Sequence, residues 1–230
     1  MSPDFSSIEN ARSKMIEQQI RPWNVLDPNV LELLAELRRE NFVPHLHRHL
    51  AFVDMEVPLP EHQVMLAPKV EARLLQELNL TPTDRVLEIG AGSGFMAALL
   101  ARQSGQVLTV EKYESLAAMA QENLNQAGIS NVEVVQANGL EENPRWAHVG
   151  FDAIVVSGSV ERLPEHLVAR LNPGGRLVAI VGQAPVMQAV LVERIGAGLS
   201  TSSNGLRTTV LFETLTKPLE DAPKISHFKF

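Results

Sequence analysis

A glycine-rich turn is the first feature of this sequence that could bind a ligand. Gly90-Ala91-Gly92-Ser93-Gly94 follows a short apolar run and opens a stretch with helical spacing. Glycines at a strand-to-helix turn allow the backbone to turn tightly and to approach a ligand closely. Such turns also occur without a ligand, so the neighbouring residues must indicate what this one binds.

The spacing of the glycines separates two classes of nucleotide cofactor. The dinucleotide fingerprint has glycines at its first, third and sixth positions, and here the sixth position is Phe95. Phenylalanine is too large for the close helix–strand packing that glycine permits. The pattern is instead Gly-x-Gly-x-Gly preceded by Glu88, the form typical of S-adenosylmethionine sites. A nicotinamide-dependent enzyme or a non-catalytic nucleotide-binding module stays as an alternative.

Two polar positions downstream suit an adenosine. Glu111 ends the next predicted strand, about 20 residues beyond the turn, where a carboxylate can accept both ribose hydroxyls. Asn138 follows the strand after that, and its side-chain oxygen can accept a hydrogen bond from the adenine amine. Each also has an ordinary interpretation, as an exposed acid or a plain Asn-Gly turn. The predicted cofactor-binding residues are Glu88, Gly90, Ala91, Gly92, Ser93, Gly94, Glu111, Lys112, Asn138 and Gly139.

Alternating strand and helix patterns surround these residues from Asp84 onwards. Strands are predicted at 85–89, 106–110, 132–135, 151–156 and 176–181, with helices at 94–103, 113–124 and 165–171 between them. This order predicts a mainly parallel sheet covered on both faces. Two further strands are expected at 186–195 and 206–215. The sequence therefore predicts an α/β fold: a Rossmann-like, seven-stranded class I methyltransferase sheet, mostly parallel with a C-terminal β-hairpin.

The first third of the chain reads as helical. Apolar residues recur at helical spacing from Ile8, and Asp27-Pro28 resembles an N-cap followed by a first-turn proline. We expect residues 1–80 to form an N-terminal helical extension that caps the substrate side. Residues 81–216 would form the S-adenosylmethionine-binding core, and residues 217–230 a C-terminal tail.

Composition limits the possible partners. The net charge of -7 disfavours an electrostatic surface for nucleic acid. No apolar run approaches the length of a membrane span, no secretory signal is visible, and cysteine is absent. We expect a cytoplasmic protein without a nucleic-acid or membrane partner.

Three histidines at alternating positions could suggest a metal site. His45, His47 and His49 lie close together in the sequence, but no acidic or cysteine partner follows at a familiar spacing. We expect a solvated or packing cluster and no metal. If the methyl acceptor were a phenol or an amine, His45, His47, His49 or His62 could instead take up its proton.

Several segments resemble the protein-L-isoaspartate O-methyltransferase family, from about Ile8 to Val210. Residues 86–95, 97–100, 151–156 and 171–177 match, although class I methyltransferases share parts of these segments widely. More specific matches lie upstream, at Arg39-Glu40-Asn41-Phe42-Val43-Pro44, Ala51-Phe52-Val53-Asp54 and Pro58-Leu59-Pro60. The resemblance implies an enzyme that transfers methyl from S-adenosylmethionine to the side carboxylate of isoaspartyl residues. This step starts protein repair and releases S-adenosylhomocysteine.

The acceptor side departs from the family pattern. The family carries Thr-Ile-Ser-Gln-Pro before its third helix, and this chain reads Val64-Met65-Leu66-Ala67-Pro68. Leu66 therefore occupies the serine position, and no catalytic residue is predicted. A carboxylate acceptor is already ionised at neutral pH, so alignment and water exclusion would suffice. The acceptor could be an isoaspartyl peptide or protein, a small metabolite, or another macromolecule.

The end of the fourth core strand completes the predicted acceptor pocket. Ligands collect at the carboxyl ends of strands in open α/β sheets, and three small residues follow the 151–156 strand. The predicted acceptor pocket comprises Met65, Leu66, Ser157, Gly158 and Ser159.

Overall fold

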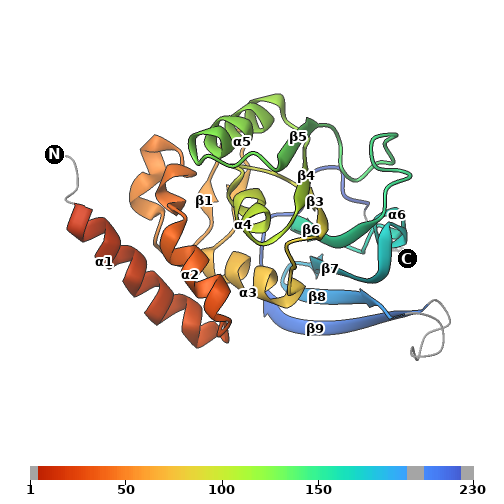
Figure 1. Cartoon of the computed structure of the whole chain (residues 1–230), viewed down its shortest axis with the longest axis horizontal. Coiled ribbons are helices and arrows are strands. Elements are labelled where there is room, and N and C mark those ends of the chain that lie inside the picture. Colours follow the sequence, from red (N-terminus) through yellow and green to blue (C-terminus); the bar gives the residue numbers. More distant parts are fainter. Residues whose placement is uncertain (1–4, 196–204, 224–230) are drawn as a thin grey trace, which may run out of the picture.

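A seven-stranded sheet forms the centre of the computed structural model, which describes residues 5–195 and 205–223 (Figure 1). The strand order is β5-β4-β3-β6-β7-β8-β9, with β3–β7 parallel to one another and β8 and β9 antiparallel to their neighbours. The predicted fold class is confirmed. The strands are β3 (Arg85–Ile89), β4 (Gln106–Glu111), β5 (Val132–Gln136), β6 (Phe151–Val160), β7 (Leu171–Gln183), β8 (Val186–Arg194) and β9 (Leu206–Thr214).

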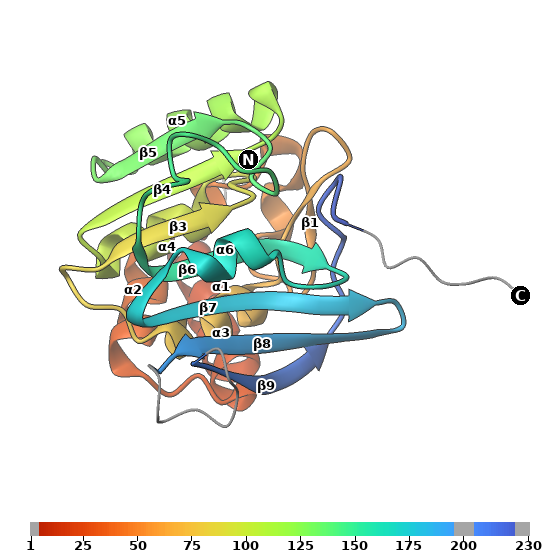
Figure 2. The ribbon, with the colours of Figure 1, turned by 90° about the vertical axis from the view of Figure 1, so that its right-hand side faces the viewer.

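Side chains of the central strands alternate between two apolar layers. Val86 and Val155 pack into the layer that contains α3 (Pro68–Leu78), α4 (Phe95–Gln103) and the N-terminal helices. Leu87 and Ile154 point the other way, towards α6 (Glu165–Ala169) and Trp146. Figure 2 shows α6 on one face of the sheet, and α1, α2, α3 and α4 on the other. Helix α5 (Glu114–Gln126) packs against β4 and β5.

Two predicted boundaries in this part of the chain were wrong. Strand β6 continues to Val160, so Ser157, Gly158 and Ser159 lie within the strand and not in a turn after it. Helix α6 ends at Ala169, and β7 begins at Leu171. The extra length of β6 has a partner outside the main sheet, because Ser159 forms a parallel bridge with Pro218.

The N-terminal extension is helical, as predicted. Helix α1 (Phe5–Met15) continues into a π-helical turn (Ile16–Ile20) and a 3₁₀ turn (Arg21–Trp23). Helix α2 (Pro28–Glu36) begins at the predicted cap, where the Asp27 side chain accepts from the Asn29 N–H. Two 3₁₀ segments follow (Arg39–Asn41 and His45–Leu50), and then a two-stranded hairpin of β1 (Val57–Pro58) and β2 (Val64–Met65).

One buried guanidinium joins the extension to the core. Arg39 is 1% exposed and forms an ion pair with Glu71 of α3. Its remaining donors reach the carbonyl oxygens of Ala51 (3.0 Å) and Leu66 (2.7 Å). The guanidinium carbon also lies 4.9 Å from the ring centroid of Phe95, the first residue of α4. The extension is therefore fixed to the helix that follows the glycine turn.

Breaking this pair should destabilise the whole protein. Removing one partner of a buried ion pair leaves the other charge uncompensated, so Arg39→Met is expected to lower the free energy of unfolding by about 3–5 kcal/mol. Urea denaturation followed by circular dichroism would measure the change. Arg207→Met is the matched control, because its pair with Glu193 lies on the solvent-exposed β8–β9 hairpin, and its loss should cost less than about 1 kcal/mol. If both variants lost the same free energy of unfolding, the buried Arg39–Glu71 pair would not have the stabilising role given to it here.

Candidate functional site

The glycine turn lies at the carboxyl end of β3 and requires glycine for its backbone. Gly90, Gly92 and Gly94 have φ angles of 93°, 53° and 84°, in the region that L side chains rarely adopt. A Cβ on Gly94 would also lie 3.1 Å from the backbone of Ala120 in α5. The turn can thus bring α4 close to α5 while its backbone stays open to the pocket.

Glu111 fixes the turn to the end of β4. Its Oε2 accepts a hydrogen bond from the Gly92 N–H at 2.9 Å, and its Oε1 accepts one from the Tyr113 N–H at 3.1 Å. Burial raises the pKa of this carboxyl, and the backbone N–H donors offset part of that rise. Each oxygen keeps a lone pair with which it can accept a further hydrogen bond.

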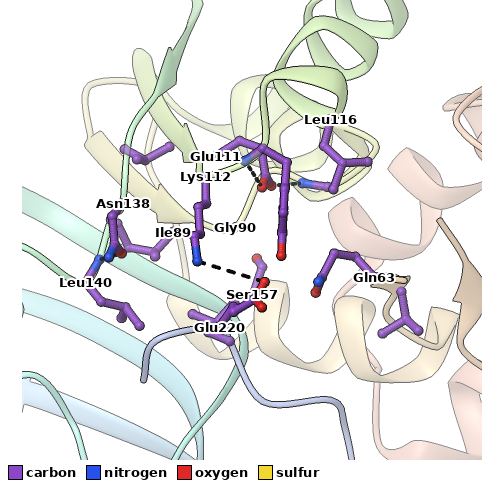
Figure 3. A pocket seen from close by; sticks show the side chains of 16 residues that line it. Gln63, Ile89, Gly90, Glu111, Lys112, Leu116, Asn138, Leu140, Ser157 and Glu220 are labelled. Carbon is purple, nitrogen blue, oxygen red and sulfur yellow. Dashed lines mark hydrogen bonds and ion pairs between the residues drawn. The ribbon is translucent and has the colours of Figure 1, made fainter. Parts of the chain in front are cut away.

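A pocket opens beside this carboxylate, across the ends of β5, β4, β3 and β6 (Figure 3). Six of the predicted cofactor residues line it: Gly90, Gly92, Glu111, Lys112, Asn138 and Gly139. Ala91, Ser93 and Gly94 belong to the turn but do not line the pocket. Ser157 also lines the pocket, although the sequence predicted it for the acceptor. The sequence did not indicate the other lining residues, which are Gln63, Val64, Ile89, Val110, Tyr113, Leu116, Leu140, Leu219 and Glu220.

Asn138 is partly engaged by its own loop. Its Oδ1 accepts a hydrogen bond from the Leu140 N–H at 3.1 Å, and its Nδ2 donates to Glu141 at 2.9 Å. A carbonyl oxygen has two lone pairs, so one remains for the predicted contact with an adenine amine. Gly139 next to it must be small, because a Cβ there would lie 2.7 Å from Ile89.

Glu88 lies beneath the pocket and does not line it. The side chain is fully buried, and its two oxygens accept hydrogen bonds from Thr109 Oγ1 (2.7 Å) and Ser157 Oγ (2.8 Å). Burial raises the pKa of Glu88 to about 8, despite these two hydroxyl donors. Ser157 is the hydrogen-bond partner of Glu88 that lines the pocket.

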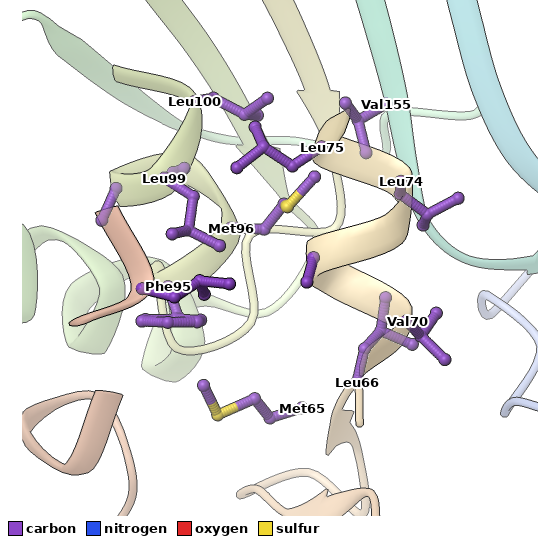
Figure 4. Close-up of a cluster of buried hydrophobic side chains, with 14 of the residues drawn as sticks. Met65, Leu66, Val70, Leu74, Leu75, Phe95, Met96, Leu99, Leu100 and Val155 are labelled. Carbon is purple, nitrogen blue, oxygen red and sulfur yellow. The ribbon is translucent and has the colours of Figure 1, made fainter. Parts of the chain in front are cut away.

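The five residues of the predicted acceptor pocket are not brought together. Met65 and Leu66 are buried among α3 and α4 (Figure 4). Ser159 donates its hydroxyl hydrogen to the Thr216 carbonyl, and Gly158 is covered by Leu219. Ser157 is the member of the five that lines the pocket of Figure 3. The apolar character of Met65 and Leu66 explains the difference, because both contribute to the core.

The segment 215–222, here called the C-terminal strap, covers one side of the pocket. A Cβ on Gly90 would lie 3.3 Å from Leu219 Cδ2, and a Cβ on Gly158 only 2.6 Å from the same atom. Lys112 Nζ lies 2.6 Å from Asp221 Oδ2 and 3.9 Å from Glu220 Oε2, the latter pair crossing the pocket in Figure 3. Leu219 and Glu220 of the predicted tail therefore line the pocket, and residues 224–230 lie outside the described residues.

The β1–β2 hairpin covers the other side. Leu59 Cδ1 lies 3.2 Å from the Cβ position of Gly92. The hairpin tip is held at two points, since Glu61 accepts from Ser115 Oγ (2.7 Å) and the His62 carbonyl accepts from Lys217 of the strap. Leu219 and Leu59 thus cover the glycine turn at Gly90 and at Gly92.

Within residues 5–195 and 205–223, no three His, Cys, Asp or Glu side chains are placed to hold a metal ion. His45 and His49 are exposed on a 3₁₀ turn, with Leu46 between them 79% exposed. No helix in the described part is both long and apolar enough for a membrane span.

Comparison with known proteins decides the family. A sequence model described as protein-L-isoaspartate(D-aspartate) O-methyltransferase matches residues 10–219. The chain belongs to this family. A protein-L-isoaspartate O-methyltransferase of Koribacter versatilis is 37% identical over 197 residues, covering 86% of this chain and 87% of that one. One from Rhodopseudomonas palustris is 41% identical over 182 residues, covering 79% and 74%.

Solved structures agree on the fold of the family. A putative protein-L-isoaspartate O-methyltransferase from Plasmodium falciparum, in complex with S-adenosyl-L-homocysteine, superposes with a TM-score of 0.76. It is 22% identical, and the match covers 91% of this chain and 98% of that one. This likeness shows the same fold. The sequence model and the relatives confirm the predicted family, and membership supports the predicted enzyme class and methyl donor.

The buried Glu88 carboxyl should make stability depend on pH. Its pKa is about 8 in the folded protein, whereas an exposed glutamate has a pKa of about 4.3. The folded state therefore holds this proton more tightly. The protonated Glu88 carboxyl therefore contributes fully to stability when the pH is below the pKa of glutamate in the unfolded chain. This contribution is lost as the pH rises through the pKa of Glu88 in the folded protein. Between pH 5 and pH 8, wild type should lose more stability than Glu88→Gln in urea titrations. Parallel pH curves for the two proteins would refute this.

Proposed function

We propose that this chain is a cytoplasmic S-adenosylmethionine-dependent O-methyltransferase that acts on the side carboxylate of isoaspartyl residues in peptides or proteins. The main support for S-adenosylmethionine as the donor is the position of Glu111. Its carboxylate accepts hydrogen bonds from the Gly92 and Tyr113 N–H groups and faces the same pocket as the glycine turn. Family membership supports an isoaspartyl carboxylate as the methyl acceptor.

The order of the strands fits the length of the donor. Asn138 follows β5, Glu111 ends β4, Gly90 follows β3 and Ser157 lies in β6, and these four strands are neighbours. With strands about 4.8 Å apart, the four positions span roughly 14 Å. Adenine beside Asn138, ribose on Glu111 and the methionine part along the glycine turn would occupy them in that order.

The residues around the pocket would hold the reactants and exclude water. When bound, S-adenosylmethionine supplies its methyl group: an O–CH₃ bond forms to the acceptor carboxylate while the S–CH₃ bond breaks and its electron pair returns to sulfur. Leu219, Val64 and Leu116 give the pocket an apolar wall. A drier pocket favours the neutralisation of sulfonium and carboxylate charges. No proton transfer is needed for a carboxylate acceptor, which agrees with the lack of a predicted base.

A second candidate keeps the donor and changes the acceptor to a small metabolite or another macromolecule. Val64 lines the pocket where the family has threonine, and Leu66, 5% exposed, lies where it has serine. Leu66 borders a separate cavity of about 210 Å³ beside Glu56 and Thr216. An acceptor less polar than an isoaspartyl carboxylate would suit these substitutions.

Donor binding should depend on Glu111. Glu111→Gln replaces an acceptor oxygen by a donor, so a ribose hydroxyl loses a charge-assisted hydrogen bond worth about 1.5–3 kcal/mol. Calorimetry should show S-adenosylhomocysteine binding about 10- to 100-fold more weakly. Glu114→Gln, on the exposed first turn of α5, is the control and should bind like wild type. Stabilisation by NAD alone in a thermal-shift experiment would instead support a nicotinamide enzyme.

The acceptor should be tested with an isoaspartyl peptide and labelled donor. We expect transfer to the isoaspartyl peptide and none to the same peptide with ordinary aspartate. Val64→Thr with Leu66→Ser restores two hydroxyls and should raise the rate, although Leu66→Ser also removes buried apolar volume at a cost of about 2–3 kcal/mol. Folding of the variant is checked by its affinity for S-adenosylhomocysteine. If both wild type and the double variant bind the donor tightly but transfer no methyl group to the isoaspartyl peptide, the result would support the second candidate, a different acceptor.

A further inference from the structure

Two cavities lie beside the C-terminal strap and share no lining residue with the pocket of Figure 3. The larger, about 320 Å³, is bordered by the strap and by the turn between β7 and β8. The smaller, about 210 Å³, lies between the segment before β1, the start of α3 and the end of β9. Glu56, Leu215 and Thr216 line both. Glu56 is therefore the charged group that the two cavities have in common.

The Glu56 carboxylate has a neutral partner. It is half-buried, and its Oε1 accepts a hydrogen bond from Thr216 Oγ1. In the part of the chain that the structure describes, the nearby cations are engaged elsewhere. Lys69, which lines the smaller cavity, is paired with Asp54 at 2.7 Å, and Lys217 donates to a backbone carbonyl of the hairpin tip. The larger cavity thus contains a carboxylate and no cation among its lining residues.

The rest of the larger cavity offers mainly apolar surface. Ala184, Met187, Leu215 and Pro218 line it, and Leu215 is 58% exposed. Lysine and arginine side chains pack a hydrocarbon stem on apolar surface while the charged head stays in a polar environment. Apolar walls beside one carboxylate match both parts of such a side chain. The volume is near the lower end of ligand pockets, about 300–1,000 Å³, so it suits one side chain and not a whole peptide.

The strap brings this cavity next to the pocket of Figure 3. It rises from the end of β9 beside the β1–β2 hairpin (Figure 2). Thr216 and Pro218 line the cavity, whereas Leu219, the next residue, lines the pocket. An extended peptide advances about 3.3–3.6 Å per residue. If its isoaspartyl carboxylate reaches the pocket, a side chain within about three residues of it can reach the cavity.

We propose that the larger cavity binds a lysine or arginine side chain of the substrate, close in sequence to the isoaspartyl residue, and that Glu56 pairs with its cationic group. The inference rests on the proposed function and adds to it a preference among damaged sites. Glu56 is then a specificity-determining residue that never touches the reacting carboxylate. Isoaspartyl residues beside basic side chains are methylated faster than those beside acidic ones.

Matched isoaspartyl peptides test this preference on the full chain with labelled S-adenosylmethionine. Each peptide carries a single lysine at one of the three positions before or after the isoaspartyl residue. Norleucine at the same position keeps the hydrocarbon stem and removes the ammonium group. At one position or more, lysine should raise kcat/KM about fivefold over norleucine, and glutamate should lower it. The change should appear in KM, because the contact is the same in the ground state and the transition state.

Two variants assign the preference to Glu56. Glu56→Gln removes the charge and keeps an oxygen that can accept the Thr216 hydrogen, so the preference for lysine should fall below about 1.5-fold. Glu213→Gln is the control. It removes one negative charge from an exposed position on β9 that lines neither cavity, and the preference should stay near fivefold. Binding of S-adenosylhomocysteine, measured by calorimetry, shows that each variant is folded.

Several results would overturn the proposal. Equal kcat/KM for lysine and norleucine peptides at every position would remove it and leave the proposed function in place, since methyl transfer itself would be observed. It also fails if the preference survives Glu56→Gln, or if Glu213→Gln abolishes it as well, because overall charge and not the cavity would then be the cause. If no isoaspartyl peptide is methylated, the proposed function falls and this inference falls with it.

Discussion

The arrangement of the site depends on the buried guanidinium of Arg39. Burying a charge is costly unless every donor is paired, and here Glu71, two backbone carbonyls and the face of Phe95 provide the partners. These partners come from the N-terminal extension, the segment before α3, α3 itself and the start of α4. Because Phe95 directly follows the glycine turn, the same interaction sets where the extension lies relative to the donor pocket.

Two leucines from distant parts of the chain cover the glycine turn. Leu59 comes from the β1–β2 hairpin and Leu219 from the C-terminal strap, and each lies against one glycine of the turn. Lys217 donates to the His62 carbonyl and so joins the strap to the hairpin tip. Gly90 and Gly92 therefore serve two purposes, since they permit the backbone geometry and leave room for the covering side chains, and Gly158 leaves room for Leu219.

The sequence predicted several residues that line one pocket, because the signals of these residues are local. The glycine turn, Glu111 and Asn138 each follow a short apolar strand, and parallel strands bring their carboxyl ends to one edge. The covering residues could not be found this way. Leu219 lies in a segment without periodicity and more than 120 residues from Gly90, and only the folded chain brings them together.

The residues predicted for the acceptor pocket do not lie together, and the reasons are physical. Ser157-Gly158-Ser159 has the composition of a turn, yet the strap bonds to Ser159 and continues β6 through it. Met65 and Leu66 were assigned to the pocket through resemblance to the family segment, but their apolar side chains are stabilised by burial in the core. Where a family position changes from hydroxyl to hydrocarbon, burial decides the role of the new residue.

A crystal structure of the protein with S-adenosylhomocysteine tests the central claim most directly. The account predicts adenine beside Asn138, both ribose hydroxyls on Glu111, and the methionine part along the glycine turn that begins at Gly90. A ligand bound in the reverse direction, or one whose ribose lies away from Glu111, would contradict it.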